Sequence, residues 1–200
     1  RPRIHTSSRC RQNRHTLTAM SAVFILGFKC FQSEKELAYT TNTYICPHCS
    51  GNLDVQYDYK KMRAKLSRKK VSESKDFTHW RYGSLFPLKS ETLRPSSGKI
   101  PRVSIGWTPL YRAPKLESDW NISTLYIKDD GRNPSASFKD SASSVVLARG
   151  LEEKAARITG ASTGNAGSSL ACLAASIQFP VTIFVPKAAP KAKIAQLLVF

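Results

Sequence analysis

Lys139 is the residue of this sequence whose setting most suggests covalent chemistry. It stands near the start of a predicted helix, after Ser137 and Phe138 and before Asp140. The positive end of a helix dipole disfavours a cation, and Phe138 offers an apolar wall. Both features favour the neutral amine, the form of lysine that attacks a carbonyl carbon to give a Schiff base. A solvated surface lysine is the alternative, and position alone favours that alternative.

A second candidate site is the run Ala-Ser-Thr-Gly-Asn-Ala-Gly at 161–167, which follows a predicted strand and opens a predicted helix. Ligands of parallel sheets bind at the carboxyl ends of strands, and the exposed N–H groups of a glycine-containing loop at a helix start bind anions. An ordinary turn with a Ser or Thr cap is the alternative. The run contains neither the dinucleotide-binding nor the P-loop spacing of glycines, so neither nucleotide site is predicted.

Three cysteines are spaced as in an incomplete zinc ribbon. Zinc ribbons take four ligands from two Cys-x-x-Cys turns. Cys46 and Cys49 make one such turn, but Cys30 is followed three residues later by Ser33, a poor zinc ligand. His48 lies inside the second turn, where its ring is not expected to reach the same ion. We expect a ribbon-shaped β module that has lost its metal; zinc on the three thiolates with a water or a histidine is the alternative.

An alternation of strands and helices is predicted to position the lysine and the loop. Strands are expected over 125–128, 156–159 and 181–185, and helices over 133–154, 168–179 and from 190 onward. This order implies an α/β fold with a right-handed, mostly parallel sheet. The helix over 168–179 consists largely of Ala, Ser and Leu, which suits close packing on that sheet.

The residues before this core predict a different organisation, and we divide the chain into four parts. Residues 1–19 are expected to form a basic leader that is disordered or not native. This leader could be part of an organellar transit peptide, translated sequence upstream of a start at Met20, or the boundary of a fragment. Residues 20–58 are expected to form short strands around the cysteine pair. Residues 59–105 hold a basic surface helix over 59–71 and an irregular connection with aromatic anchors. The catalytic α/β core occupies 106–200.

The composition excludes several classes of protein. Hydrophobic residues make up 41% of the 200 residues and aromatic residues 10%, which excludes wholesale disorder. No apolar run is long enough to span a bilayer. Five cysteines without a secretory signal favour a reducing compartment, the cytoplasm. The net charge of +17 is typical of polyanion binders, but the excess gathers in residues 1–19 and 60–75, and we expect no nucleic-acid or membrane partner.

Several motifs in order resemble the threonine synthase family, pyridoxal-phosphate enzymes of the tryptophan-synthase-β fold type. They are Gly-Trp-Thr-Pro-Leu at 106–110, the run from Lys128 to Asp140, and Ala-Ser-Thr-Gly-Asn at 161–165. The turn at 46–49, with the strand that follows, resembles the zinc-ribbon-like N-terminus of many members. The resemblance covers nearly everything after the leader. It implies a three-layer, parallel-sheet fold with a small β-rich segment before it.

The resemblance also implies roles for the candidate residues. Lys139 would form the Schiff base with pyridoxal 5'-phosphate, Phe138 would line the cofactor, and Asn165 would hydrogen-bond its ring hydroxyl. The α-carboxylate of the substrate would be held by four loop residues: Ser162, Thr163, Gly164 and Asn165. The substrate would be O-phospho-L-homoserine, and the products L-threonine and phosphate. Any metal would be bound by Cys30, Cys46 and Cys49. A homo-oligomer is left open.

The sequence departs from the family in two ways, and rival functions remain. Ser141 stands where the family usually has Arg after the Lys-Asp pair. Members are also considerably longer, so we expect an N-terminal portion that is inactive alone, with the cofactor-phosphate loop beyond residue 200. Within the fold, the alternatives are a serine/threonine dehydratase and a cysteate synthase. In another class, the alternative is a non-catalytic, basic, polyanion-binding protein.

Overall fold

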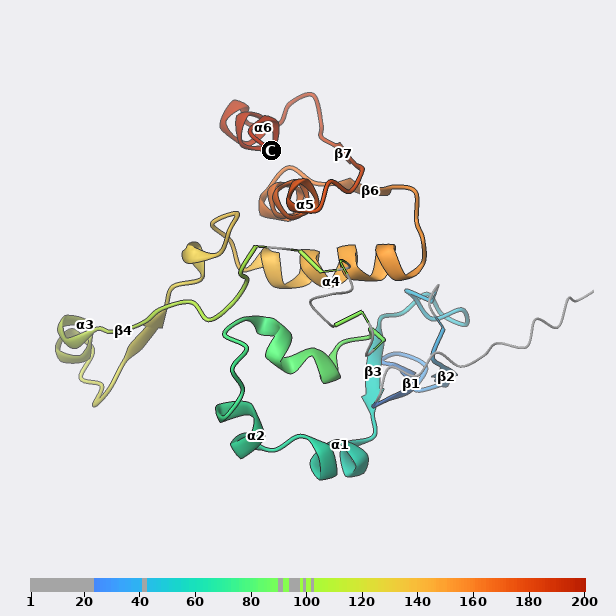
Figure 1. Cartoon of the computed structure of the whole chain (residues 1–200), viewed down its shortest axis with the longest axis horizontal. Helices are drawn as coiled ribbons and strands as arrows, with labels where there is room; N and C mark the ends of the chain where they lie inside the picture. The colour runs from blue at the N-terminus through green and yellow to red at the C-terminus, as the bar shows by residue number, and fades with distance from the viewer. Residues whose placement is uncertain (1–23, 41–42, 90–91, 94–97, 99, 102) are drawn as a thin grey trace, which may run out of the picture.

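A computed structural model describes residues 24–200 except 41–42, 90–91, 94–97, 99 and 102 (Figure 1). The predicted leader over residues 1–19 lies outside the described residues. Within the described part, no helix is both long and apolar enough to cross a membrane.

The segment that carries the cysteines folds into a three-stranded antiparallel sheet. Its strands are β1 (Ile25–Cys30), β2 (Glu36–Ala38) and β3 (Leu53–Tyr57), in the spatial order β2-β1-β3. The strand predicted over 53–57 is therefore present. Gly27 allows β1 and β2 to approach, because a Cβ there would lie 2.3 Å from the Leu37 carbonyl oxygen. The sheet places the last residue of β1 beside the first residue of β3, and with them the two cysteine turns.

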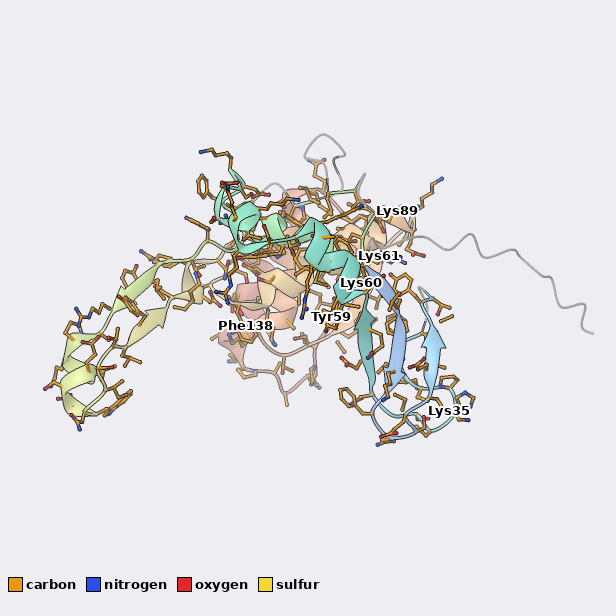
Figure 2. The ribbon with its side chains drawn as sticks, turned by 90° about the horizontal axis from the view of Figure 1, so that it is seen from below. Lys35, Tyr59, Lys60, Lys61, Lys89 and Phe138 are labelled. Carbon is orange, nitrogen blue, oxygen red and sulfur yellow. The ribbon has the colours of Figure 1, made fainter. Side chains whose placement is uncertain are left out.

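The basic segment after β3 is two short helices where one was predicted. They are α1 (Tyr59–Lys65) and α2 (Arg68–Ser72). The break falls at Leu66, which is extended, and at Ser67, whose side chain accepts the Lys70 N–H and so caps the second helix. Lys60, Lys61 and their basic neighbours are exposed, as expected of a surface helix (Figure 2). A 3₁₀ helix, η1 (His79–Leu85), follows.

The α/β part contains a parallel pair of strands covered by helices. β6 (Ile158–Ala161) and β7 (Val181–Phe184) pair in parallel, with Ile158 opposite Val181. The helices are α4 (Lys139–Glu152), α5 (Asn165–Ser176) and α6 (Lys191–Leu198). Strands and helices alternate as predicted, and α4 and α5 lie side by side in Figure 1. The α/β class is confirmed for the described residues.

The predicted strand over 125–128 does not join the parallel sheet. It forms β5 (Tyr126–Lys128), which pairs antiparallel with β4 (Leu110–Arg112) in a separate arm (Figure 1). The arm closes locally around α3 (Pro114–Asp119): the buried Glu117 carboxylate accepts two bonds of 3.0 Å from Arg112 and one of 2.9 Å from the Leu125 N–H. These bonds hold the pKa of Glu117 below its ordinary value. Every residue of both strands is exposed, so the arm does not contribute to the core.

The core lies mainly between α4 and α5. Ile105, Leu147, Leu173 and Ala174 are fully buried there, and burial of each large aliphatic side chain contributes roughly 1.5–3 kcal/mol. A second cluster joins Trp80 of η1 to Ala148 of α4. Small residues on the buried face of α5 allow the close packing that its composition predicted. The core thus holds together the two helices whose first turns carry the candidate chemistry.

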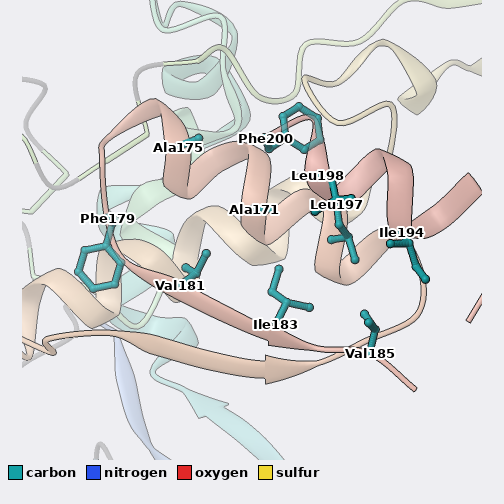
Figure 3. Close-up of a pocket in the computed structure, with 10 residues that line it drawn as sticks. All are labelled: Ala171, Ala175, Phe179, Val181, Ile183, Val185, Ile194, Leu197, Leu198 and Phe200. Atoms are coloured by element: carbon teal, nitrogen blue, oxygen red, sulfur yellow. The ribbon is translucent and has the colours of Figure 1, made fainter. Parts of the chain in front are cut away.

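An apolar hollow of about 380 Å³ lies between α5, β7 and α6 (Figure 3). Its lining is aliphatic and aromatic and includes Val181, Ile183 and Leu197. Neither Lys139 nor any residue of the 161–167 loop lines it. The hollow is therefore separate from the candidate functional site.

Candidate functional site

The loop before α4 is held rigidly by its own polar side chains. The fully buried Asp140 accepts the Ser135 N–H at 2.8 Å and the Ser135 hydroxyl. Asn133 accepts the Gly106 N–H at 2.9 Å, which ties two of the motifs together. Ala136 adopts a left-handed φ of 57°. These contacts explain why the helix predicted from residue 133 begins only at Lys139.

Lys139 is the first residue of α4, and the loop presents its amine beside an aromatic ring. Its side chain is half-buried, and Nζ lies 4.3 Å from the centroid of the Phe138 ring. Phe138 itself is 58% exposed, so its outer part is open to a planar ligand. The expected apolar wall beside the amine is therefore present, in a position where an aromatic cofactor could contact both groups.

The 161–167 loop forms the start of α5, as its position after a strand predicts. The Ser162 Oγ accepts the Gly167 N–H at 3.0 Å and the Gly164 N–H at 3.3 Å. It therefore satisfies an N–H of the first turn of α5 from outside the helix, whereas the N-cap residue, Gly164, makes no side-chain cap bond. Thr163 and Asn165 are exposed, and a Cβ added at Gly164 would meet no atom within 4 Å. Space thus exists beside the positive end of a twelve-residue helix, where an anion is stabilised.

Lys193 is a residue of this site that the sequence analysis missed. From α6 its Nζ donates to the Asn165 Oδ1 at 2.9 Å. Because the amide oxygen is occupied, the amide nitrogen of Asn165 remains to donate to a ligand. Lys193 lies 28 residues from Asn165 in a lysine-rich stretch, and nothing in its sequence neighbourhood indicates that it would contact Asn165.

His79 supports α4 from the opposite element, η1. It is 9% exposed, and its Nε2 lies 3.0 Å from the Ser144 Oγ on α4. Burial lowers the His79 pKa from 6.5 to about 4, and Asp76 opposes this only partly. The imidazole is therefore neutral at pH 7. With Trp80 packed against it, His79 is an anchor of the core.

The three thiols meet at the edge of the antiparallel sheet. The Sγ atoms of Cys30, Cys46 and Cys49 all lie within 4.8 Å of one another. The Ser33 side chain and N–H bond to Cys30 and lower its pKa to about 6. His48 is exposed and is not part of this group. Three thiols are thus gathered in one place, and the Ser33 hydroxyl lies 3.5 Å from the Cys46 Sγ.

The residues around Lys139 also fit pyridoxal phosphate by their chemistry. A primary amine, an aromatic wall, an amide donor and an anion-binding helix start are what such a cofactor and its amino-acid substrate require. These features lie on two helices that pack directly on each other.

The chain belongs to the family of pyridoxal-phosphate-dependent enzymes, whose model matches residues 102–200. Within that family it is similar to threonine synthases. It is 32% identical over 158 residues to the threonine synthase of Methanosarcina acetivorans, covering 79% of this chain and 36% of the relative. The threonine synthase of Methanocaldococcus jannaschii is 33% identical over 159 residues, 80% of this chain and 37% of the relative. The resemblance drawn from the motifs is confirmed, and the chain spans a little over a third of the length of these relatives.

Proposed function

We propose that this chain is part of a threonine synthase that converts O-phospho-L-homoserine and water to L-threonine and phosphate. One observation carries the proposal: Lys139 opens α4 at the end of a loop locked by residues of two family motifs. The similarity to threonine synthases over about four fifths of the chain supports the same reaction. A small molecule is the proposed substrate, and the cytoplasm stays a prediction from the cysteine content.

The proposed cofactor, pyridoxal phosphate, supplies an electron sink when bound, and the chain's own residues would do the rest. Lys139 would hold the cofactor through Nζ and, once released from it, move protons at the substrate's carbon atoms. Phe138 would shield one face of the ring from water. Asn165, oriented by Lys193, would donate from its amide nitrogen to the ring oxygen. The loop residues Thr163, Gly164 and Asn165 would hold the α-carboxylate at the α5 start, and Ser162, which already accepts the N–H groups of Gly164 and Gly167, would fix the turn.

The finer description of the fold is part of the same proposal. The parallel pair β6 and β7 and the helices α4, α5 and α6 would belong to the three-layer, tryptophan-synthase-β-like fold. The sheet β2-β1-β3, with its cysteine turns, would be the zinc-ribbon-like segment. The four-part division of the chain stays a prediction.

Cofactor attachment tests the proposal most directly. The protein is expressed over its whole open reading frame, incubated with pyridoxal phosphate, reduced with borohydride and digested for mass spectrometry. The expected result is a reduced cofactor on Lys139, which Lys139→Ala abolishes. Lys139→Arg should not restore it, because the guanidinium stays protonated. Lys191→Ala, at an exposed lysine of α6, is the matched control and should label normally. Labelling of another lysine would refute the assignment.

Product analysis separates the proposed reaction from its rivals in the fold. A threonine synthase releases phosphate from O-phospho-L-homoserine, whereas a serine/threonine dehydratase releases ammonia from threonine or serine. If Lys139 is labelled but the protein releases ammonia and no phosphate, the assignment to pyridoxal-phosphate enzymes stands and the threonine synthase reaction is rejected.

A further inference from the structure

The thiol cluster is built by two tight turns that face each other across the end of the sheet. After β1, the Cys30 N–H donates to the Lys35 carbonyl at 3.0 Å and the Glu34 N–H donates to the Cys30 carbonyl at 3.0 Å. Lys35 marks this turn in Figure 2. Before β3, the Cys46 N–H donates to the Gly51 carbonyl at 2.9 Å. Both turns are closed by backbone bonds, so the sulfur positions are set by the fold.

The sulfur spacing suits a single metal ion. A zinc–sulfur bond of about 2.3 Å puts two thiolates about 3.8 Å apart around a tetrahedral ion and about 4.0 Å apart around a trigonal one. The Sγ atoms of Cys30 and Cys49 are 3.4 Å apart, and all three sulfurs lie within 4.8 Å of one another. Changes of at most about 1 Å in these separations would therefore bring three thiolates onto one ion.

Ser33 lies where a fourth ligand would stand. Its Oγ is 3.5 Å from the Cys46 Sγ, and its N–H donates to the Cys30 Sγ at 3.4 Å. Around a tetrahedral zinc, an oxygen at about 2.0 Å and a sulfur at about 2.3 Å are separated by about 3.5 Å. The hydroxyl is thus at coordinating distance from the same centre, but a neutral hydroxyl is a much weaker ligand than a thiolate.

The absence of a side chain at Gly51 leaves room for the Cys30 sulfur and the Gln32 side chain beside it. A Cβ at Gly51 would lie 2.7 Å from the Gln32 side chain and 3.2 Å from the Cys30 Sγ. A side chain there would displace the end of the Gln32 side chain and press on the Cys30 sulfur. Cys30 and Cys46 are fully buried and Cys49 is exposed, so a bound ion would be covered by protein on one side and reach solvent through the other.

We propose that Cys30, Cys46 and Cys49 bind one zinc ion as three thiolates, with the Ser33 hydroxyl as a weak fourth ligand. This differs from the four-thiolate site of a complete ribbon. Three thiolates leave a net charge of −1 on a divalent ion instead of −2, and one coordination position exchanges readily. The site therefore holds zinc less tightly than a complete ribbon and accepts an external ligand there. The proposal takes the alternative to the expectation that the module has lost its metal.

Metal titration of the full chain under reducing conditions tests this, with Co²⁺ as the spectroscopic probe and Zn²⁺ as the competitor. We expect one Co²⁺ per chain, with thiolate-to-cobalt absorption that one equivalent of Zn²⁺ removes. Ser33→Cys should strengthen that absorption and raise zinc affinity by at least about tenfold, because even an outer contact to a metal ligand is worth about 10–100-fold. Cys49→Ser should abolish tight binding.

The controls make the outcome decisive. Cys172→Ser, in α5 and outside the cluster, should titrate like the parent. Ser33→Cys exchanges one oxygen for sulfur, so failure to fold is a poor explanation for any loss. Absence of thiolate absorption in both the parent and Ser33→Cys would overturn the metal site. Equal zinc affinity of the parent and Ser33→Cys would overturn the role given to Ser33. The titration needs no pyridoxal phosphate, so neither outcome bears on the proposed function.

Discussion

Lowering the pH should destabilise the protein through His79, which joins η1 to α4 in the core. The ring is buried, its Nε2 bonds to the Ser144 Oγ at 3.0 Å, and burial lowers its pKa from 6.5 to about 4. The unfolded chain takes up the proton below pH 6.5, whereas the native state resists it down to about pH 4. The unfolded state thus binds more protons in this range, so the free energy of unfolding falls as the pH falls.

The size of the effect follows from the two pKa values. Each unit of pKa shift corresponds to about 1.4 kcal/mol, so the full shift is worth about 3 kcal/mol. Between pH 7 and pH 5, most of the unfolded chains become protonated at this residue while the native ring stays neutral. The expected loss of unfolding free energy over that interval is about 2 kcal/mol.

Urea unfolding at pH 7, 6 and 5, followed by tryptophan fluorescence, measures this loss. Trp80 is a local reporter, because its ring centroid is 4.3 Å from that of His79. The matched control is His79→Gln, which can still donate to Ser144 but does not titrate. Cys30, whose pKa is about 6, is present in both proteins, so its contribution cancels in the difference. Equal pH dependence of the parent and His79→Gln would refute the reasoning.

Two further predictions concern the candidate site. Lys193→Met removes the 2.9 Å bond to Asn165. Because the bond is exposed and such contacts are worth about 0.2–1 kcal/mol, the substrate KM should rise by up to about fivefold. Steady-state kinetics of the protein expressed over its whole open reading frame, beside Lys191→Met on the exposed side of α6, checks this, and an unchanged KM would remove Lys193 from the site. Asp140→Asn weakens the two bonds to Ser135 and should lower the free energy of unfolding by about 1–3 kcal/mol. Urea unfolding measures this loss, with Asp54→Asn, at an exposed aspartate, as the control. Equal stability of the two variants would show that other contacts hold the loop.

Local features of the chain could be predicted from its sequence alone. The alternation in residues 53–57, the small residues of α5 and the apolar run of β7 each indicate the element that forms there. Lys139 at a helix start and the 161–167 loop after a strand were found in the same way. These features are encoded by neighbours within one or two turns, so a short window of sequence contains the physical information that decides them.

The tertiary structure decided what depends on partners distant along the chain. β5 pairs with β4 in the arm that the Glu117 bonds to Arg112 and Leu125 close, and not with the parallel strands, which the local pattern of residues 125–128 did not reveal. The helix expected from residue 133 starts at Lys139 because Asp140 and Gly106 bind the loop residues before it. Lys193 reaches Asn165 only because α6 packs against α5.

The thiol site shows both contributions in one place. Spacing alone identified Cys30, Cys46 and Cys49 as candidate ligands and showed that Ser33 stands where a complete ribbon would have a fourth thiol. Whether they meet depends on the pairing of β1 with β3. This pairing brings Cys30 and Cys49, which are 19 residues apart in the sequence, to an Sγ separation of 3.4 Å. The residue types at each position determine which chemistry is available, and these can be read directly from the sequence. The distances between the reacting atoms are determined by the sheet and the helices, because only packing brings segments remote in the sequence together.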